Sequence, residues 1–359
     1  MKILLLAGEE SGVMYASRLR GLLQGHEIRG YAESGFATAD LAVFGFWEVL
    51  KRAFFFMRVK RTMERVIDEW RPDVVCTIDY PGMNLRLAAY AKKRGIPAVH
   101  VVCPQVWAWH QGRIPKIEAS IDRLCCFFPF EPSLFRPGFA EFVGHPLADE
   151  YARRPPSIGR EKGLVALLPG SRIGEIRRLL PLMLEAVRGM EGVRVAIPAA
   201  NDDARAEIER IAAGVPAEVL SRGARDLLDR AECAVVASGT ATLEAALAGC
   251  PTLLVYKVSA LLACFLRIAI TGVRHAGLAN IIAEKSGREC PMPELLQGDA
   301  TAERMRGYVE RWIRDAEERR RSSAALAETV ALLRSDGRAM DRIADIVVQE
   351  AEKKRRNGE

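Results

Sequence analysis

The segment at residues 164–175 is LVALLPGSRIGE, an apolar run that ends in a glycine turn and continues into a helix-like stretch. A strand that enters a helix through such a turn presents several backbone N–H groups and the positive end of the helix dipole at one place. Arg172 adds a guanidinium, which can donate two parallel hydrogen bonds to phosphate oxygens. The turn, with Gly170 and Ser171, therefore predicts an anion site; an ordinary strand–helix turn with a surface arginine is the alternative.

Apolar runs of the same kind alternate with helix-like segments on both sides of this stretch. They lie at residues 3–7, 74–78, 98–102, 124–128, 193–197, 217–220, 233–237 and 252–256. Such alternation predicts an α/β fold with parallel sheets and crossover helices. The proline-rich stretch 153–157 interrupts it, so we expect two Rossmann-like domains facing a cleft, at residues 1–152 and 160–336. A helix at about 337–359 is expected to pack back on the first domain.

The composition argues against several classes of protein. The 359 residues suit two domains, and 52 basic against 46 acidic residues give a net charge of +6, too balanced to indicate nucleic acid. No secretory leader, no CxxC pair and no apolar run of about 20 residues is evident, so we expect a cytoplasmic protein. The five histidines lack ligand spacing and there is no Asp-x-Asp pair, so no metal or other cofactor is expected.

A second turn of the same character follows the apolar run 233–237. It contains Ser238, Gly239 and Thr240, with Glu244 about one helical turn further on. Turns at the carboxyl ends of strands in one open sheet converge on one crevice. A nucleoside diphosphate fits this pair of turns, with Glu244 holding ribose hydroxyls. A Ser/Thr helix cap followed by an early glutamate explains the second turn alone, but not the pairing.

In the first domain, polar residues follow two of the apolar runs. Residues 8–12 are GEESG, where Glu9 and Ser11 suit a hydroxyl-rich sugar better than a phosphate; helix capping is the alternative. Asp79 ends the run 74–78, where a carboxylate is costly unless it is paired or faces a cleft. We predict that Asp79 is a general base, the alternative being a structural aspartate that caps the next helix near Asn84.

Two stretches combine apolar side chains with cations. Residues 50–61, LKRAFFFMRVKR, place Phe54, Phe55 and Phe56 among five cations, and residues 258–270 are apolar except for Arg267. Apolar anchors flanked by cations suit an anionic membrane surface, whereas core packing is the alternative. The basic end at residues 353–356 suits either a solvated end or membrane contact.

The chain resembles the lipid A disaccharide synthases in an ordered series of motifs. These are GEESG (8–12), LAVFG (41–45), EVL (48–50), IDYP (78–81) with Asn84, CPQVWAW (103–109), KI (116–117), PFE (129–131), FVGHPLAD (142–149), PGSR (169–172), SGTATLE (238–244), NI (280–281) and PELLQ (293–297). The series covers most of the chain, and both VWAW and the ordered combination are highly specific, as no single glycine turn would be. The chain departs from the family pattern at Val13 and Gly82, where the family usually has aspartate, and at Ala279, where it usually has proline.

This resemblance implies a GT-B glycosyltransferase that inverts its donor without a metal. It implies transfer of 2,3-diacylglucosamine from UDP to 2,3-diacylglucosamine 1-phosphate, with Asp79 as base and Glu9, Ser11 and Asn84 at the acceptor sugar. The UDP-binding residues it implies are Gly170, Ser171, Arg172, Ser238, Gly239, Thr240, Glu244 and Asn280. Phe54, Phe55, Phe56, Trp107 and Trp109 would contact lipid, placing the protein peripherally at the inner membrane, and a homodimer is compatible with the pattern.

Two other classes of function remain open from the residues. Another UDP-sugar GT-B enzyme, such as a peptidoglycan glucosaminyltransferase or a UDP-N-acetylglucosamine 2-epimerase, would share the phosphate turns. An epimerase needs no lipid surface, so the Phe54 cluster and the Trp107–Trp109 loop argue against it. A catalytically silent lipid- or UDP-sugar-binding protein is the second alternative, which the departures at Val13 and Gly82 allow.

Overall fold

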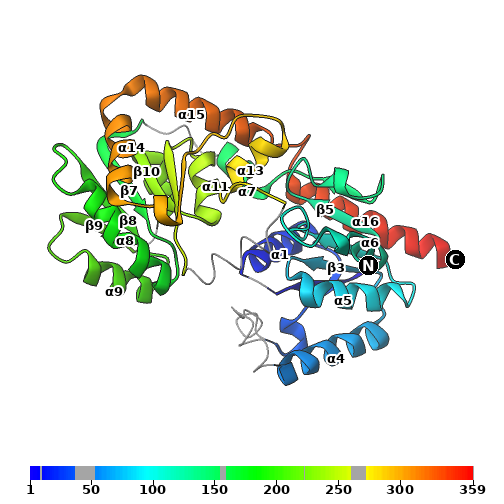
Figure 1. The fold of residues 1–359 in the computed structure, drawn as a ribbon. Coiled ribbons are helices and arrows are strands. Elements are labelled where there is room, and N and C mark those ends of the chain that lie inside the picture. The colour runs from blue at the N-terminus through cyan, green and yellow to red at the C-terminus, as the bar shows by residue number, and fades with distance from the viewer. Residues whose placement is uncertain (9, 37–52, 154–158, 222, 260–271, 359) are drawn as a thin grey trace. The chain divides into compact units, whose positions relative to one another are not determined.

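A computed structural model describes residues 1–359 except 9, 37–52, 154–158, 222, 260–271 and 359. The described chain divides into two compact units (Figure 1). Unit 1 comprises Met1–Pro146 and Arg334–Glu359, and unit 2 comprises Leu147–Leu333. Among the described residues, no helix has both the length and the apolar character needed to cross a bilayer.

Unit 1 is built on a six-stranded sheet in the order β2-β1-β3-β4-β5-β6, in which every pairing is parallel. The strands are β1 Lys2–Ala7, β2 Glu27–Arg29, β3 Val74–Ile78, β4 Ala98–Val101, β5 Arg123–Cys126 and β6 Ala140–Phe142. The central strands β1, β3 and β4 are buried along almost their whole length, as continuous apolar runs in a parallel sheet require.

Helices cover both faces of this sheet. They are α1 Glu10–Leu22, α4 Ala53–Trp70, α5 Pro81–Lys92, α6 Ile114–Ser120 and α16 Ala339–Gly358. On one face, Leu19 of α1 and Ile343 and Val347 of α16 pack against Ile3 and Leu5. The predicted return of the C-terminal helix to the first domain is therefore confirmed, and Ser335 fixes its approach by donating to the Val143 carbonyl at 2.7 Å.

Helices α4 and α5 cover the other face of the same sheet. Val59, Met63 and Ile67 recur at helical spacing along α4 and are fully buried against Leu4 and Leu6 of β1. For part of the Phe54–Arg61 stretch, the alternative of core packing therefore applies on this side of α4. The opposite side of the helix faces away from the sheet.

Unit 2 repeats the plan with the strand order β12-β11-β10-β7-β8-β9, again parallel throughout. The strands are β7 Glu161–Leu168, β8 Arg194–Pro198, β9 Ala217–Leu220, β10 Ala231–Ala237, β11 Thr252–Tyr256 and β12 Glu294–Leu296. The helices are α8 Ile173–Val187, α9 Asp202–Ile211, α10 Ala224–Arg230, α11 Thr240–Leu247, α13 Leu278–Lys285, α14 Ala302–Arg314 and α15 Ala316–Ala331, with α7 Pro146–Ala152 at the unit boundary.

The central strands β7 and β10 place their carboxyl ends side by side, because Val235 and Val236 pair with Leu167 and Leu168. The two turns singled out in the sequence leave the sheet at these ends. The fold thus places the start of α8 and the start of α11 next to each other.

Candidate functional site

A cavity of about 440 Å³ lies at the carboxyl edge of the unit 2 sheet. Both predicted phosphate turns line it, and the segments after β8 and before α10 complete it. The lining residues are Leu168, Gly170, Ser171, Arg172, Glu175, Pro198, Ala199, Ala200, Gly223, Ala224, Ala237, Ser238, Gly239, Thr240 and Ala241. The two turns, which are about 70 residues apart in sequence, therefore share one cavity, as the topology of a parallel sheet requires.

The first turn is shaped by Gly170, whose φ of +106° is rarely adopted by residues with a side chain. A Cβ at this position would lie 2.5 Å from Oε2 of Glu175. The glycine therefore allows the chain to pass directly over the first turn of α8. Arg172, 67% exposed, donates to Glu175 at 2.8 Å, so that one cation and one carboxylate flank the cavity.

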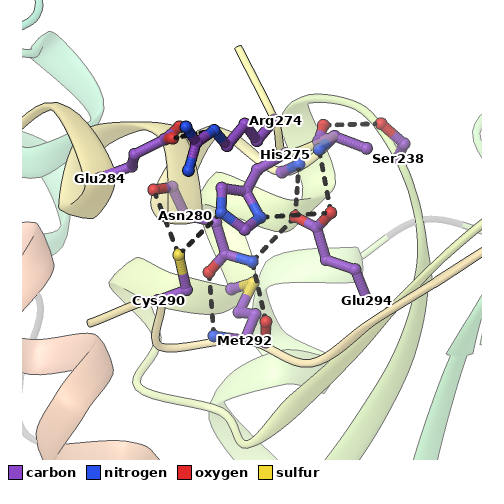
Figure 2. Close-up of polar contacts among 10 residues, drawn as sticks. Ser238, Arg274, His275, Asn280, Glu284, Cys290, Met292 and Glu294 are labelled. Atoms are coloured by element: carbon purple, nitrogen blue, oxygen red, sulfur yellow. Dashed lines mark hydrogen bonds and ion pairs between the residues drawn. The ribbon is translucent and has the colours of Figure 1, made fainter.

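The second turn is fixed from a distance by a buried network around Asn280 (Figure 2). The Asn280 side-chain nitrogen donates to the Met292 carbonyl and to Glu294, both at 2.8 Å, and its oxygen accepts from the Met292 amide at 3.0 Å. Glu294 also accepts the backbone N–H groups of Ala276 and Gly277 at 3.0 Å. The Ala276 carbonyl in turn accepts from the Ser238 hydroxyl at 3.0 Å.

Two of the residues predicted to bind UDP, Asn280 and Glu244, lie outside the lining of the cavity. Asn280 is buried and its amide is hydrogen-bonded within the protein, to Met292 and Glu294. Glu244 accepts from Arg225 at 2.9 Å, and Arg225 also donates to Glu150 at 2.7 Å.

In unit 1, Asp79 follows β3 in a left-handed turn, with φ of +51° at both Asp79 and Tyr80. Such a pair of non-glycine residues is strained and persists only where surrounding contacts impose it. The Asp79 carboxylate accepts its neighbour's amide, Tyr80 N–H, at 2.8 Å. The Tyr80 ring lies where a Cβ on Gly8 would come within 2.6 Å, so this turn requires the glycine that follows β1.

Asn84 supplies the contacts that impose the turn. Its side-chain nitrogen donates to the carbonyls of Asp79 at 2.8 Å, Ile78 at 3.1 Å and Leu6 at 3.3 Å, and its oxygen accepts from Tyr31 at 2.7 Å. Asn84 is fully buried. The expectation that it contacts the acceptor sugar is therefore corrected: it holds the Asp79 backbone from inside the protein.

Burial shifts the pKa of the Asp79 carboxyl. Desolvation raises its pKa above the ordinary aspartate value, and the hydrogen bond from Tyr80 lowers it by a smaller amount. A carboxylate with a raised pKa accepts a proton more readily near neutral pH. Glu9 lies outside the described residues, and so does the side chain of Ser11, although its backbone belongs to α1.

The aromatic residues expected to contact lipid divide into exposed and buried groups. Phe54 is 84% exposed and Trp109 is 43% exposed, whereas Phe55 is half-buried. Phe56 packs into the core beneath α4, and Trp107 is buried, donating to Glu131 at 3.0 Å and packing edge-on to Phe128 and Phe130. The expectation of lipid contact is therefore corrected for Phe56 and Trp107. The predicted stretch 258–270 lies outside the described residues except for Val258 and Ser259.

One group of potential metal ligands occurs among the described residues. Cys103, Cys126 and Glu131 have ligand atoms within 4.8 Å of one another, and all three are buried. Both Glu131 oxygens already accept hydrogen bonds, from Trp107 and from the Phe128 amide at 3.0 Å each. Burial raises the pKa of Glu131 to about 8, and its two hydrogen bonds hold the Trp107 loop.

The sequence of this chain is similar to that of one family of known enzymes. A model of the lipid-A-disaccharide synthetase family matches residues 3–346. The lipid-A-disaccharide synthase of Syntrophus aciditrophicus is 39% identical over 86% of this chain and 87% of that protein. The enzyme of the same description from Anaeromyxobacter dehalogenans is 36% identical over 97% of each chain.

Solved structures with the same fold are more distant in sequence. MurG of Acinetobacter baumannii superposes with a TM-score of 0.59 and 13% identity, covering 97% of this chain and 99% of that one. S. aureus MnaA, solved with UDP, superposes with a TM-score of 0.61 and 13% identity, covering 95% and 94%. These likenesses show the GT-B fold of two Rossmann-like units.

Proposed function

Because the chain belongs to the lipid-A-disaccharide synthetase family, it is a glycosyltransferase of lipid A biosynthesis, and we propose which substrates and residues it uses. The donor is UDP-2,3-diacylglucosamine and the acceptor is 2,3-diacylglucosamine 1-phosphate. The products are the β-1,6-linked disaccharide 1-phosphate and UDP. The family match does not favour the alternatives of an epimerase or a silent binding protein.

The observation that carries this proposal is the shared cavity of the two glycine turns in unit 2. The UDP diphosphate binds there, against the starts of α8 and α11 and the Arg172 guanidinium. Helix N-termini and an arginine stabilise the negative charge that develops on the leaving UDP. Unit 2 is thus the nucleotide-binding unit, and unit 1 carries the acceptor and the base.

Asp79 removes the proton from the acceptor 6-hydroxyl as that oxygen attacks the anomeric carbon of the donor. The bond between the anomeric carbon and the UDP oxygen breaks at the same time, and UDP leaves with its electron pair. Attack from the face opposite UDP converts the α-linked donor into a β-linked product. The raised pKa of Asp79 supports this role, because a base is most effective when its pKa lies near the working pH.

The exposed face of α4 supports a peripheral position at the inner membrane. Phe54, Met57, Arg58, Arg61 and Arg65 recur at three- and four-residue intervals, and all are exposed. The stripe opens with two apolar side chains and continues with three cations, while the opposite side of α4 is buried. Apolar insertion combined with attraction to anionic headgroups is the pattern of an interfacial helix.

The proposal is tested with purified protein and both lipid substrates in nonionic detergent micelles containing excess EDTA. Mass spectrometry follows UDP release and disaccharide formation. Disaccharide formed despite the chelator supports both the reaction and its independence of divalent metal. Protein that binds UDP but forms no disaccharide would refute the proposed substrates.

A further inference from the structure

A second cavity, of about 180 Å³, lies in unit 1 between α5 and α6. Three cations line it: Arg86 from α5, and Arg113 and Lys116 from the start of α6 and the turn before it. Its remaining walls are apolar or small, including Leu85, Ala89 and Ile117, and no acidic residue lines it. The cavity is large enough for a phosphate group, since one water occupies only about 30 Å³ in the liquid.

These three cations have no carboxylate partner among the described residues. Elsewhere in the same unit, Lys92 at the end of α5 pairs with Asp122 at 3.0 Å, and Arg123 pairs with Glu141 at 2.6 Å. Three positive charges gathered around one cavity repel each other unless an anion joins them. The arrangement therefore fits a ligand group that carries more than one negative charge.

The cavity also lies close to the proposed base. Pro81 and Gly82, the first residues of α5, form part of its wall, and Asp79 precedes Pro81 by two residues. Two residues of extended chain span about 7 Å at most. The N-terminal end of α5 adds the positive end of its dipole to the same wall. The wall that Pro81 and Gly82 form therefore lies beside the Asp79 turn.

We propose that this cavity binds the 1-phosphate of the acceptor, an inference that rests on the function proposed above. A phosphomonoester carries about −1.5 to −2 charges at pH 7. The 1-phosphate is on C1 and the 6-hydroxyl is on C6, which is attached to C5; C1 and C5 flank the ring oxygen, so the rigid ring keeps the two groups at a nearly fixed separation. A phosphate held by Arg86, Arg113 and Lys116 would therefore direct the 6-hydroxyl towards Asp79, and it would distinguish the acceptor from a sugar that lacks the phosphate.

The test compares two acceptors, 2,3-diacylglucosamine 1-phosphate and 2,3-diacylglucosamine, in neutral detergent micelles. The variants Arg86→Gln and Lys116→Gln should each raise KM for the phosphorylated acceptor about 10- to 100-fold, the range of a charge-assisted hydrogen bond. KM for the donor should be unchanged, and the rate with the phosphate-free acceptor should equal that of the wild type. Lys93→Gln, which removes an exposed cation of the same helix region outside the cavity, serves as the matched control.

Equal losses with both acceptors, or an unchanged KM, would overturn the proposal. An effect that appears only when anionic phospholipid is added to the micelles would assign the cavity to a membrane headgroup instead. If the wild type forms no disaccharide, that result refutes the proposed reaction but not the proposed phosphate site. In that event, calorimetric binding of the two lipids to the wild type and the variants still decides whether the cavity recognises the phosphate.

Discussion

The side-chain nitrogen of Asn84 lies 2.8 Å from the carbonyl oxygen of Asp79, and it holds the left-handed turn that presents the proposed base. The same amide satisfies two other buried carbonyls, at the ends of β1 and β3. The placement of Asp79 is thus tied directly to two central strands of the unit 1 sheet.

We expect Asn84→Ala to lower kcat about 10- to 100-fold and to destabilise unit 1 by about 1–3 kcal/mol, because it leaves buried carbonyls unpaired. UDP affinity, measured by calorimetry, should be unchanged because the proposed UDP cavity lies in unit 2. Tyr31→Phe removes only the hydrogen bond to the Asn84 oxygen and should have a smaller effect. A loss of stability without a loss of kcat would contradict the positioning role.

Replacing Asp79 by asparagine or alanine should reduce turnover by about 10²–10⁴-fold while UDP still binds. In the wild type, the deprotonated base is lost as pH falls through its raised pKa. The acid limb of the kcat profile should therefore lie at higher pH than an ordinary aspartate would give. An acid limb that survives in Asp79→Asn would assign it to another group.

Arg172→Ala should weaken UDP binding and slow transfer together, because in the proposed site the guanidinium contacts the diphosphate in both ground and transition states. Glu175→Gln should tighten UDP binding, since it removes the carboxylate that flanks the cavity and pairs with Arg172. Arg188→Ala removes an exposed cation at the opposite end of α8 and serves as the control. Unchanged UDP affinity in Arg172→Ala would exclude this residue from the site.

The buried carboxyl of Glu131 should make stability depend on pH. Between the ordinary glutamate pKa of 4.5 and the raised pKa of about 8, the folded protein keeps a proton that the unfolded chain releases. The contribution of this group to the free energy of unfolding is therefore present at low pH and decreases as pH rises through that window. In denaturant titrations, the advantage of the wild type over Glu131→Gln should shrink from pH 5 to pH 8. A constant difference would mean that Glu131 does not titrate in this range.

Substituting Phe54 or Met57 by serine should weaken binding to vesicles that contain anionic phospholipid. Removing one inserted apolar side chain costs about 1.5–3 kcal/mol, or about 10- to 100-fold in the partition coefficient. Leu22→Ser serves as the control, because Leu22 is a similarly exposed apolar residue at the end of α1. Vesicle flotation that does not distinguish the three variants would remove α4 from the membrane surface.

The sequence predicts the fold well because the long strands are continuous apolar runs that end in turns. The three-residue strands β2, β6 and β12 escape notice, since segments so short carry no periodicity. The sequence could also predict that the two glycine turns share one cavity, because neighbouring parallel strands end at the same edge of a sheet. The lining at Pro198–Ala200 and Gly223–Ala224 has no charged or hydroxyl side chain to mark it.

The sequence pattern alone does not predict in which direction a side chain points. Asn84 and Asn280 occur beside the expected sites, yet each amide is satisfied by backbone groups inside the protein. Trp107 is held by Glu131, 24 residues further along the chain, and only the folded structure brings the two together. Trp107 and Trp109 look equivalent in sequence, but the first is buried and the second is exposed.

Unit 1 is formed by two segments that are far apart in the sequence, and this affects when each unit can fold during synthesis. Residues of α16 cover one face of the sheet that contains β1, so the hydrophobic layer with Ile3 and Leu5 stays open until residues 339–358 have been synthesised. Unit 2 is contiguous in sequence and is complete earlier on the ribosome. Domains usually fold in order from the N-terminus during synthesis, but here we expect unit 2 to be able to fold while unit 1 still lacks α16.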